Sequence, residues 1–334
     1  MTSTRTRAAT PRRRARRRST RRMRAQTRER LWHVGGGVAA VVVGAVALSV
    51  LAGVLSDGAW PWVVATYLRW PQVLLSAGAT AVLFAGRWWR TGAAAALVTA
   101  GLIASVAAPL TALTTVPPGG AATLRVAVFN TGAGSADVAE VAQAIAAARP
   151  DVAVLLESED IAERLERRLD GLARLPTSLE GTPMTAAPVV LARREWPVRV
   201  APLGEGRPAV IATAEVGGRP LDVVGFHPLP PISPGWTRSH QASVRALTDE
   251  VLPRAHPFVL ACDCNAAPWT PSMARLLDAG LREPTVAATF GAPLVGVPTD
   301  HVLLGDGVAA VSRELGSFAG SDHRLVVTEI TLRG

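Results

Sequence analysis

The pattern of hydrophobic and polar positions divides the chain into an apolar first third and an alternating remainder. Three runs without a charged residue come first, at 34–56, 70–86 and 91–116. A helix of about 20 apolar residues crosses a bilayer. The second run is somewhat short, but it reaches that length if the helix starts nearer Trp60. Arg69 must then extend to the membrane surface or face protein. A cleaved signal peptide fits this pattern poorly, because the first run is long and two more follow it. We therefore predict three transmembrane helices within 33–116.

After a Pro- and Gly-rich linker at 117–122, segments with a strand-like pattern alternate along the chain with segments whose apolar residues have helical spacing. The strand-like segments are short and either alternate apolar with polar residues or are aliphatic throughout. Strands are predicted at 124–130, 151–157, 188–194, 209–216, 221–227, 257–265, 301–305 and 323–332. Helices are predicted at 137–150, 161–175, 237–252 and 272–280. Roughly 210 residues with this alternation are enough to bury one core. The sequence thus predicts a single α/β domain at 123–334.

The basic charge of the chain is concentrated in its N-terminal tail. Residues 1–30 hold thirteen Arg and one Glu, a net charge of +12, whereas residues 92–334 hold nineteen Arg and twenty-four acids, a net charge of −5. Such a tail can bind nucleic acid or anionic lipid, but Arg-rich segments that precede a membrane span stay in the cytoplasm. We interpret residues 1–32 as a disordered cytoplasmic anchor of a multi-pass protein of the cell membrane. Three spans then place the α/β domain outside the cytoplasm, with the bilayer as its partner; no protein partner can be inferred.

The stretch "VLACDCNAAPW" at 259–269 contains the only two cysteines of the chain, Cys262 and Cys264. Strand side chains alternate between two faces, so both cysteines share the aliphatic face with Phe258 and Leu260, and Asp263 points the other way. A disulfide between residues two apart in a strand is expected to be strained, and no further Cys or His stands at metal-finger spacing. We therefore expect buried free thiols and assign the chemistry to Asp263 and Asn265.

Polar side chains stand at the ends of six predicted strands. They are Asn130, Glu157, His227, the pair Asp263 and Asn265, the pair Asp300–His301, and the group Ser321–Asp322–His323. Most of them have a structural explanation when taken alone, since Asn favours turns and a single His is commonly structural. Glu157 is harder to explain in this way, because an acid that closes a buried aliphatic run needs a partner. If these ends converge on one edge of a single mixed sheet, they form an oxygen- and imidazole-lined basin suited to a hard cation such as Mg²⁺.

These strand ends resemble the endonuclease/exonuclease/phosphatase superfamily with its DNase I-like fold. The motifs are "LRVAVFN", "PDVAVLLE", "VVGFHP", "ACDCNAAPW", "PTDHVLL" and "GSDHRLVV", in family order over about 123–332. The resemblance implies a four-layer sandwich of two mixed β-sheets flanked by helices. It also implies hydrolysis of a phosphoester with Mg²⁺ (or Mn²⁺), and the three spans ahead of the domain resemble a membrane-bound bacterial branch.

The resemblance implies a role for each polar residue. Glu157 resembles the principal metal ligand, helped by Asn130, and Asp322 faces this metal or a second one.

For the catalytic residues, Asp263 resembles the acid that orients or deprotonates the attacking water, and Asn265 holds a phosphate oxygen. His227 stabilises the phosphate or helps the leaving group, as imidazolium or neutral donor. His323 resembles the histidine of the "SDH" element, oriented by Asp300. Either Asp263 or His323 can be the base.

Several positions depart from the family pattern. Cys262 replaces the usual Gly before the Asp, Cys264 replaces the aromatic residue after it, and "ARREWP" at 192–197 replaces the usual Ser-Arg. The only tyrosine, Tyr67, lies in the apolar third. We therefore expect no tyrosine at the scissile phosphate.

Three functions remain open at this stage. The first is a phosphodiesterase or endonuclease that acts on nucleic acid or a small phosphodiester outside the membrane. The second is a phosphomonoesterase or a hydrolase of phospholipid headgroups, suggested by the apolar loop "HPLPPISPGW" at 227–236. The third is a membrane-tethered binding module without turnover. The negative charge of 92–334 disfavours a long nucleic acid, because grooves for nucleic acid need basic patches.

Overall fold

The computed structural model describes residues 11–56, 58–107, 122–132, 135–177, 187–203, 207–252, 255–283, 285–291 and 296–333. The chain divides into two compact units. One comprises Met1–Leu48 and Gln72–Ile103, and the other comprises Ser49–Pro71 and Ala104–Gly334. The first ten residues of the predicted tail, most of the predicted linker and the end of the predicted third span lie outside the described residues, and the predicted domain boundaries remain predictions.

The first unit is built from three helices, α1 (Pro11–Leu55), α3 (Arg69–Ala85) and α4 (Trp89–Ala107). Small and branched side chains such as Ala39, Val43, Leu83 and Ala95 are buried where these helices pack. Among the described residues, two helical stretches are long and apolar enough to cross a membrane, Arg22–Gly53 and Trp89–Ala107. Helix α3, at the predicted second span, has 17 residues. The prediction of three transmembrane helices is therefore not confirmed.

The second unit contains two mixed β-sheets. The six-stranded sheet has the order β10-β11-β1-β2-β4-β3, with β1 parallel to β2 and the remaining pairs antiparallel. Its strands are β1 (Thr123–Asn130), β2 (Val152–Leu156), β3 (Ala173–Arg174), β4 (Val189–Ala192), β10 (Val308–Leu315) and β11 (Val326–Leu332). The five-stranded sheet has the order β5-β6-β7-β8-β9, with only β7 and β8 parallel. Its strands are β5 (Val198–Ala201), β6 (Ala209–Val216), β7 (Arg219–Phe226), β8 (Phe258–Asp263) and β9 (Asp300–Leu304).

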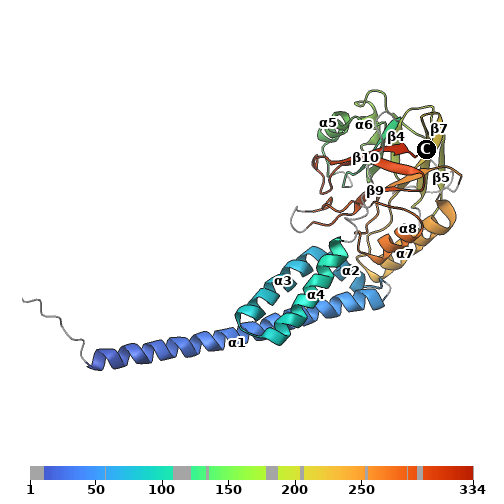
Figure 1. Cartoon of the computed structure of the whole chain (residues 1–334). Coiled ribbons are helices and arrows are strands. Elements are labelled where there is room, and N and C mark those ends of the chain that lie inside the picture. Colours follow the sequence, from blue (N-terminus) through green and yellow to red (C-terminus); the bar gives the residue numbers. More distant parts are fainter. Residues whose placement is uncertain are drawn as a thin grey trace, which may run out of the picture. The chain divides into compact units, whose positions relative to one another are not determined.

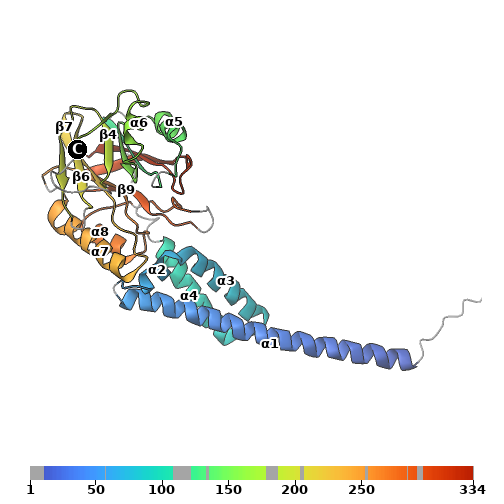
Figure 2. The same ribbon diagram turned by 180° about the vertical axis from the view of Figure 1, so that it is seen from behind.

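The sheets pack face to face, and helices cover both outer faces. Valines such as Val126, Val154, Val223 and Val259 fill the core between the sheets. Helices α5 (Val138–Ala148) and α6 (Ala162–Glu166) bury the outer face of the six-stranded sheet. The outer face of the five-stranded sheet is buried by helix α7 (Pro234–Ala246), the π-helical turn η2 (Leu247–Val251) and helix α8 (Pro271–Asp278). The two helix groups therefore lie on opposite sides of the pair of sheets (Figures 1 and 2). The predicted four-layer sandwich is confirmed.

Local sequence explains how the helices begin and end. Asp137 caps α5 because its side chain accepts hydrogen bonds from the backbone of Ala139 and Glu140. Ser233 and Thr270 cap α7 and α8 in the same way, each followed by a proline in the first turn. The helix predicted at 161–175 is shorter than expected: α6 ends at Glu166, and β3 follows after Gly171 with a φ of 79°. Strands β5 and β10 were not predicted.

Candidate active site

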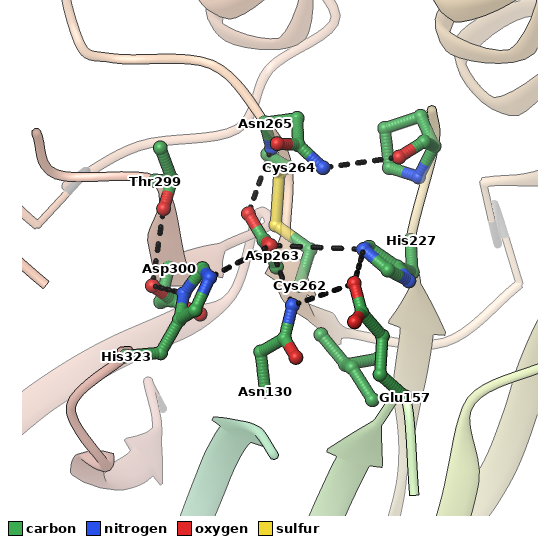
Figure 3. A network of polar contacts seen from close by, with 12 residues as sticks. Asn130, Glu157, His227, Cys262, Asp263, Cys264, Asn265, Thr299, Asp300 and His323 are labelled. Atoms are coloured by element: carbon green, nitrogen blue, oxygen red, sulfur yellow. Dashed lines mark hydrogen bonds and ion pairs between the residues drawn. A yellow bond between two sulfur atoms is a disulfide. The ribbon is translucent and has the colours of Figure 1, made fainter. Parts of the chain in front are cut away.

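The strand ends of both sheets, rather than of the single mixed sheet expected, meet at one edge of the second unit and bring all eight predicted site residues together. Figure 3 labels all of them except Asp322. Asn130 closes β1 and Glu157 follows β2, both in the six-stranded sheet. In the other sheet, His227 follows β7, Asp263 closes β8 and Asp300 opens β9. Two further residues, Asp322 and His323, precede β11, and Asn265 lies just beyond β8. Parallel neighbours end at the same edge, which is why β1 with β2 and β7 with β8 place their polar ends side by side.

Asp263 stands at the centre of the cluster and is 1% exposed. Its Oδ2 accepts a hydrogen bond of 3.0 Å from Asn130 Nδ2, which also donates to Glu157 Oε1 at 3.1 Å. The backbone N–H of Gly132 donates to Asn130 Oδ1 at 2.9 Å and so fixes the orientation of the amide. Asn130 therefore holds the two carboxylates together by presenting donors to both.

Two of these residues adopt a backbone conformation that is rare outside glycine. Glu157 has a φ of 55° and Asn265 a φ of 43°. Both positions turn the chain sharply at a strand end, so that the Asn265 N–H donates to Asp263 Oδ1 at 3.0 Å and its Nδ2 donates to the Pro228 carbonyl at 3.1 Å. Strained backbone of this kind is concentrated at functional sites.

Asp300 and His323 form a hydrogen-bonded pair. His323 Nδ1 lies 2.9 Å from Asp300 Oδ2, which also accepts from the Thr299 hydroxyl at 3.1 Å. Thr289 Oγ1 in turn accepts from the Asp300 N–H at 3.0 Å. His323 Nε2 then points toward the centre, 3.8 Å from Asp263 Oδ2 and 4.0 Å from Asp322 Oδ1. The pair thus fixes the direction of the imidazole.

The charges of the site set the ionisation of this histidine. Burial lowers the pKa of His323, but the negative charges of Asp263 and Asp300 outweigh it and raise the pKa to about 9. Burial raises the pKa of Asp263, and the nearby Asp300 charge adds to the effect. In the protein alone, His323 is therefore an imidazolium at neutral pH.

His227 behaves differently although it faces the same carboxylates. Its Nε2 lies 3.5 Å from Glu157 Oε1 and 3.6 Å from Asp263 Oδ2, and neither ring nitrogen makes a hydrogen bond to any residue that the structure describes. Burial lowers the pKa of His227 to about 4 despite the opposing charge of Asp263. A buried imidazole with no hydrogen bond costs stability. The ring is thus buried behind the Glu157 and Asp263 carboxylates and has no hydrogen-bond partner among the described residues.

The cysteines differ from the expectation, because Cys262 and Cys264 form a disulfide. The expectation of free thiols assumed that the strand continues through Cys264, which would separate the two Cα atoms by about 6.6 Å. Instead β8 ends at Asp263, the chain turns at Asn265, and the Cα atoms are 4.9 Å apart. Both residues are still fully buried on the aliphatic face, as predicted. The bond encloses Asp263 (Figure 3).

A cavity of about 820 Å³ opens over the cluster, and part of its wall is unexpected. Asn130, Glu157, Asp263, Asn265, Asp322 and His323 line it together with apolar side chains. Tyr67, which the sequence pattern places in the apolar third outside the predicted domain, also lines the cavity, and its hydroxyl donates to the Asn265 carbonyl. Sequence reasoning also missed Phe290, whose ring centroid lies 4.8 Å from that of His323.

The donors of the site fit a hard divalent cation. Oxygen atoms of Glu157, Asp263 and Asp322 line one cavity, and Ca²⁺ and Mg²⁺ prefer such ligands. Asp263, Asp300 and His323 each offer a ligand atom within 4.8 Å of the others. Because Asp300 already binds His323 Nδ1, we assign this second group to the His–Asp pair rather than to a metal.

Comparisons with known proteins agree with this geometry. The model of the endonuclease/exonuclease/phosphatase family matches residues 127–323. Among solved structures, an endonuclease/exonuclease/phosphatase from Beutenbergia cavernae is 21% identical with a TM-score of 0.52, over 64% of this chain and 72% of that one. A functionally unknown conserved protein from Enterococcus faecalis is 16% identical with a TM-score of 0.54, over 63% of this chain and all of that one. The mannosyl-6-phosphatase Bt3783 from Bacteroides thetaiotaomicron is 14% identical with a TM-score of 0.50, over 63% and 100%. No curated protein matches the chain. At these identities the structural likeness shows the fold alone.

Proposed function

Because the chain belongs to the endonuclease/exonuclease/phosphatase family, we propose that it is a membrane-anchored, extracytoplasmic phosphoesterase that depends on a divalent metal and acts on a phosphodiester. The observation that carries this proposal is the convergence on Asp263. One side of this carboxylate meets the Asn130–Glu157 pair, and the other meets His323, which Asp300 orients. These are the parts that a hydrolytic site needs: acids for a metal, and groups that direct a water and a proton.

The metal has a defined place in this proposal. Glu157, with Asp263 and Asp322, would hold Mg²⁺ or Mn²⁺, and the bound ion would act as a Lewis acid on the phosphate and lower the pKa of its bound water. Asn130 orients the two carboxylates through its amide N–H groups; ligation by its oxygen remains a prediction.

The remaining residues act on the water and the phosphate. Asp263 and His323 both line the cavity. Asp263 Oδ2 is placed to take the proton of the attacking water, and His323 Nε2, 3.8 Å away, can serve as this base only after the imidazolium has lost its own proton. His227 is a neutral imidazole at pH 7, because its pKa is lowered to about 4, and its ring nitrogens have no hydrogen-bond partner among the described residues. We propose that it donates a hydrogen bond to a phosphate oxygen. Asn265 and His323 add donors where negative charge develops on phosphorus-bound oxygens.

Two observations support an extracytoplasmic site. The Cys262–Cys264 disulfide is of a kind that persists in oxidising compartments and is rare in the cytosol. The Arg-rich tail favours a cytoplasmic N-terminus, from which the three spans predicted from the sequence would carry the domain across, whereas the two candidate spans found among the described residues would not. Alkaline phosphatase fused after residue 120 should be active, and an inactive fusion would place the domain in the cytoplasm.

The test of the function uses the full-length protein in detergent. With Mg²⁺ or Mn²⁺ it should hydrolyse bis(p-nitrophenyl) phosphate, and EDTA should stop the reaction. The Asp263→Asn variant should lower kcat by at least about a hundredfold. Asp222→Asn serves as the matched control, because Asp222 is a buried carboxylate beside a different histidine, 3.5 Å from His256 Nδ1. Full activity in Asp263→Asn would remove Asp263 from the catalytic machinery, and no turnover with any metal and any phosphoester would favour the binding-module alternative.

A further inference from the structure

The segment Ser49–Pro71 belongs to the same compact unit as the catalytic domain, although it lies in the apolar third of the sequence. Three hydrogen bonds attach it. Trp269 Nε1 donates to the Thr66 carbonyl at 2.7 Å, Gln241 Nε2 donates to the Gly58 carbonyl at 3.1 Å, and Tyr67 donates to the Asn265 carbonyl. The family match begins only at residue 127. This chain therefore builds part of its site from outside the family domain.

That added part is an apolar wall. Val64 and Tyr67, from helix α2 (Trp62–Tyr67), face the cavity together with Pro230, Pro231 and Ile232 of the loop after β7. Phe290 and Val297 also line the cavity, and Phe290 lies against the His323 ring. A phosphate at Asp263 and His323 would thus have apolar surface directly beside it. A bare phosphodiester or a sugar phosphate has nothing to place against such a wall.

The outer surface of the same region is also apolar. Trp60, Trp62 and Trp70 are 45%, 39% and 39% exposed, and Leu68 and Ile232 are 50% and 62% exposed. Tryptophan is enriched where protein meets the headgroup layer of a bilayer. The segment overlaps the end of the apolar stretch Arg22–Gly53 and the start of the apolar run at 70–86. These features place Ser49–Pro71 at a membrane surface.

We infer that the substrate is a phosphoester lipid of the bilayer, whose headgroup phosphate reaches Asp263 and His323 while its apolar body packs against Val64, Tyr67 and Ile232. The inference rests on the proposed function and specifies its substrate class. In the reaction, the oxygen of water bonds to phosphorus, one phosphorus–oxygen ester bond breaks, and the leaving oxygen takes up a proton. The net charge of −5 over 92–334 agrees with this choice, because it offers no basic groove for a nucleic acid.

Two chromogenic diesters test the inference without knowledge of the headgroup. p-Nitrophenyl methyl phosphate and p-nitrophenyl dodecyl phosphate share the scissile bond and differ only in the apolar body. Each methylene buried on the wall raises affinity about fourfold, so full-length protein with Mn²⁺ should show a kcat/KM at least about a hundredfold higher for the dodecyl ester. Val64→Asp and Ile232→Asp should each lower this ratio at least about tenfold. Ala147→Glu, which adds a carboxylate at an exposed position of α5, should leave the ratio unchanged.

Vesicles of phosphatidylethanolamine and phosphatidylglycerol form the second arm, with linear DNA as the competing substrate. Release of headgroup or phosphate from the vesicles, lost in Val64→Asp, supports the inference. Equal kcat/KM values for the two diesters, an unchanged ratio in both wall variants, or preferred cleavage of DNA would overturn it while leaving the phosphoesterase intact. If neither diester nor bis(p-nitrophenyl) phosphate is cleaved, the proposed function fails as well.

Discussion

Replacing Asp300 by Asn removes one negative charge from the site while keeping the shape of the side chain. Asp300 is fully buried, and its Oδ2 accepts from both His323 Nδ1 and the Thr299 hydroxyl. Asparagine retains one carbonyl acceptor, so the hydroxyl and the imidazole must compete for it or the amide N–H₂ must face Nδ1. The substitution therefore weakens the imidazolium form and frees the ring to adopt the other tautomer.

The size of the effect follows from the distance. A unit charge 2.9 Å from the imidazolium contributes an attraction of about 6 kcal/mol at an effective dielectric constant of about 20. One retained hydrogen bond returns about 1 kcal/mol, and the Asp263 charge, 3.8 Å from Nε2, remains. If His323 carries its charge in the transition state and not in the metal-bound ground state, a net loss of about 3–5 kcal/mol in the transition state corresponds to a kcat lower by roughly 10²–10⁴-fold.

Steady-state hydrolysis of bis(p-nitrophenyl) phosphate measures this loss, and NMR of the imidazole in EDTA-treated protein measures its cause. The pKa of His323 should fall from about 9 toward its ordinary value, because one of the charges that raise it is gone. The Asp222→Asn variant should stay within about threefold of wild type in kcat. If Asp300→Asn also stays within threefold, the pair does not orient a catalytic histidine and the reasoning is refuted.

Three further outcomes are expected. Mn²⁺ at about a hundred times its Kd should raise the Tm by roughly 5–10 °C, and Glu157→Gln should abolish this rise; an equal rise in the variant would remove Glu157 from the metal site. His240 is buried between Leu229 and Ser272, and burial lowers its pKa to about 4, so only the unfolded state takes up a proton on it between about pH 6.5 and 4. His240 alone should therefore contribute roughly 3 kcal/mol to the fall in the free energy of unfolding over that window, measured by urea titration. The buried His227 and His301 add to the same fall, and His240→Gln should reduce it by the His240 share. Tyr67→Phe should lower kcat on both diesters about fivefold by releasing the Asn265 carbonyl, and an unchanged kcat would deny the hydroxyl a positioning role.

The strand that ends at Asp263 shows both the reach and the limit of alternation as a predictor. Val259 and Ala261 pack between the sheets, whereas Leu260 and Cys262 face the helices α7 and α8, as the period of two predicts. The same pattern extended through Cys264 gave the wrong bonding state, because the strand stops one residue earlier. Alternation predicts the face of a residue only while the strand lasts, and nothing local marks where it ends.

The site was predictable as a set of strand ends that converge on one edge. Their division between two stacked sheets came from the resemblance to a family, because the strand ends alone suggested one mixed sheet. Strand β10 escaped prediction because its Ser312, Arg313 and Glu314 interrupt the apolar pattern. In the segment 161–175, predicted as one helix, Leu165 and Leu169 are buried as the helical spacing indicates. The helix itself is shorter than predicted, because α6 ends at Glu166.

Tyr67 was missed for a different reason. The segment Ser49–Pro71 is attached through the backbone carbonyls of Gly58 and Thr66, and carbonyls carry no sequence signal. One hint was available: Trp60, Trp62 and Trp70 crowd a short stretch between apolar runs. Aromatic density of this kind marks an interface, although it does not say with what.

The sulfur bridge around residue 263 also bears on when the protein matures. If the domain is exported as proposed, the nascent chain carries two thiols on either side of its central acid while it is in the reducing cytosol, and oxidation closes the small loop around Asp263 only after translocation. Catalytic competence would then be acquired after export rather than during synthesis. Preparations made under reducing conditions would contain folded but immature molecules, so oxidant belongs in every purification buffer.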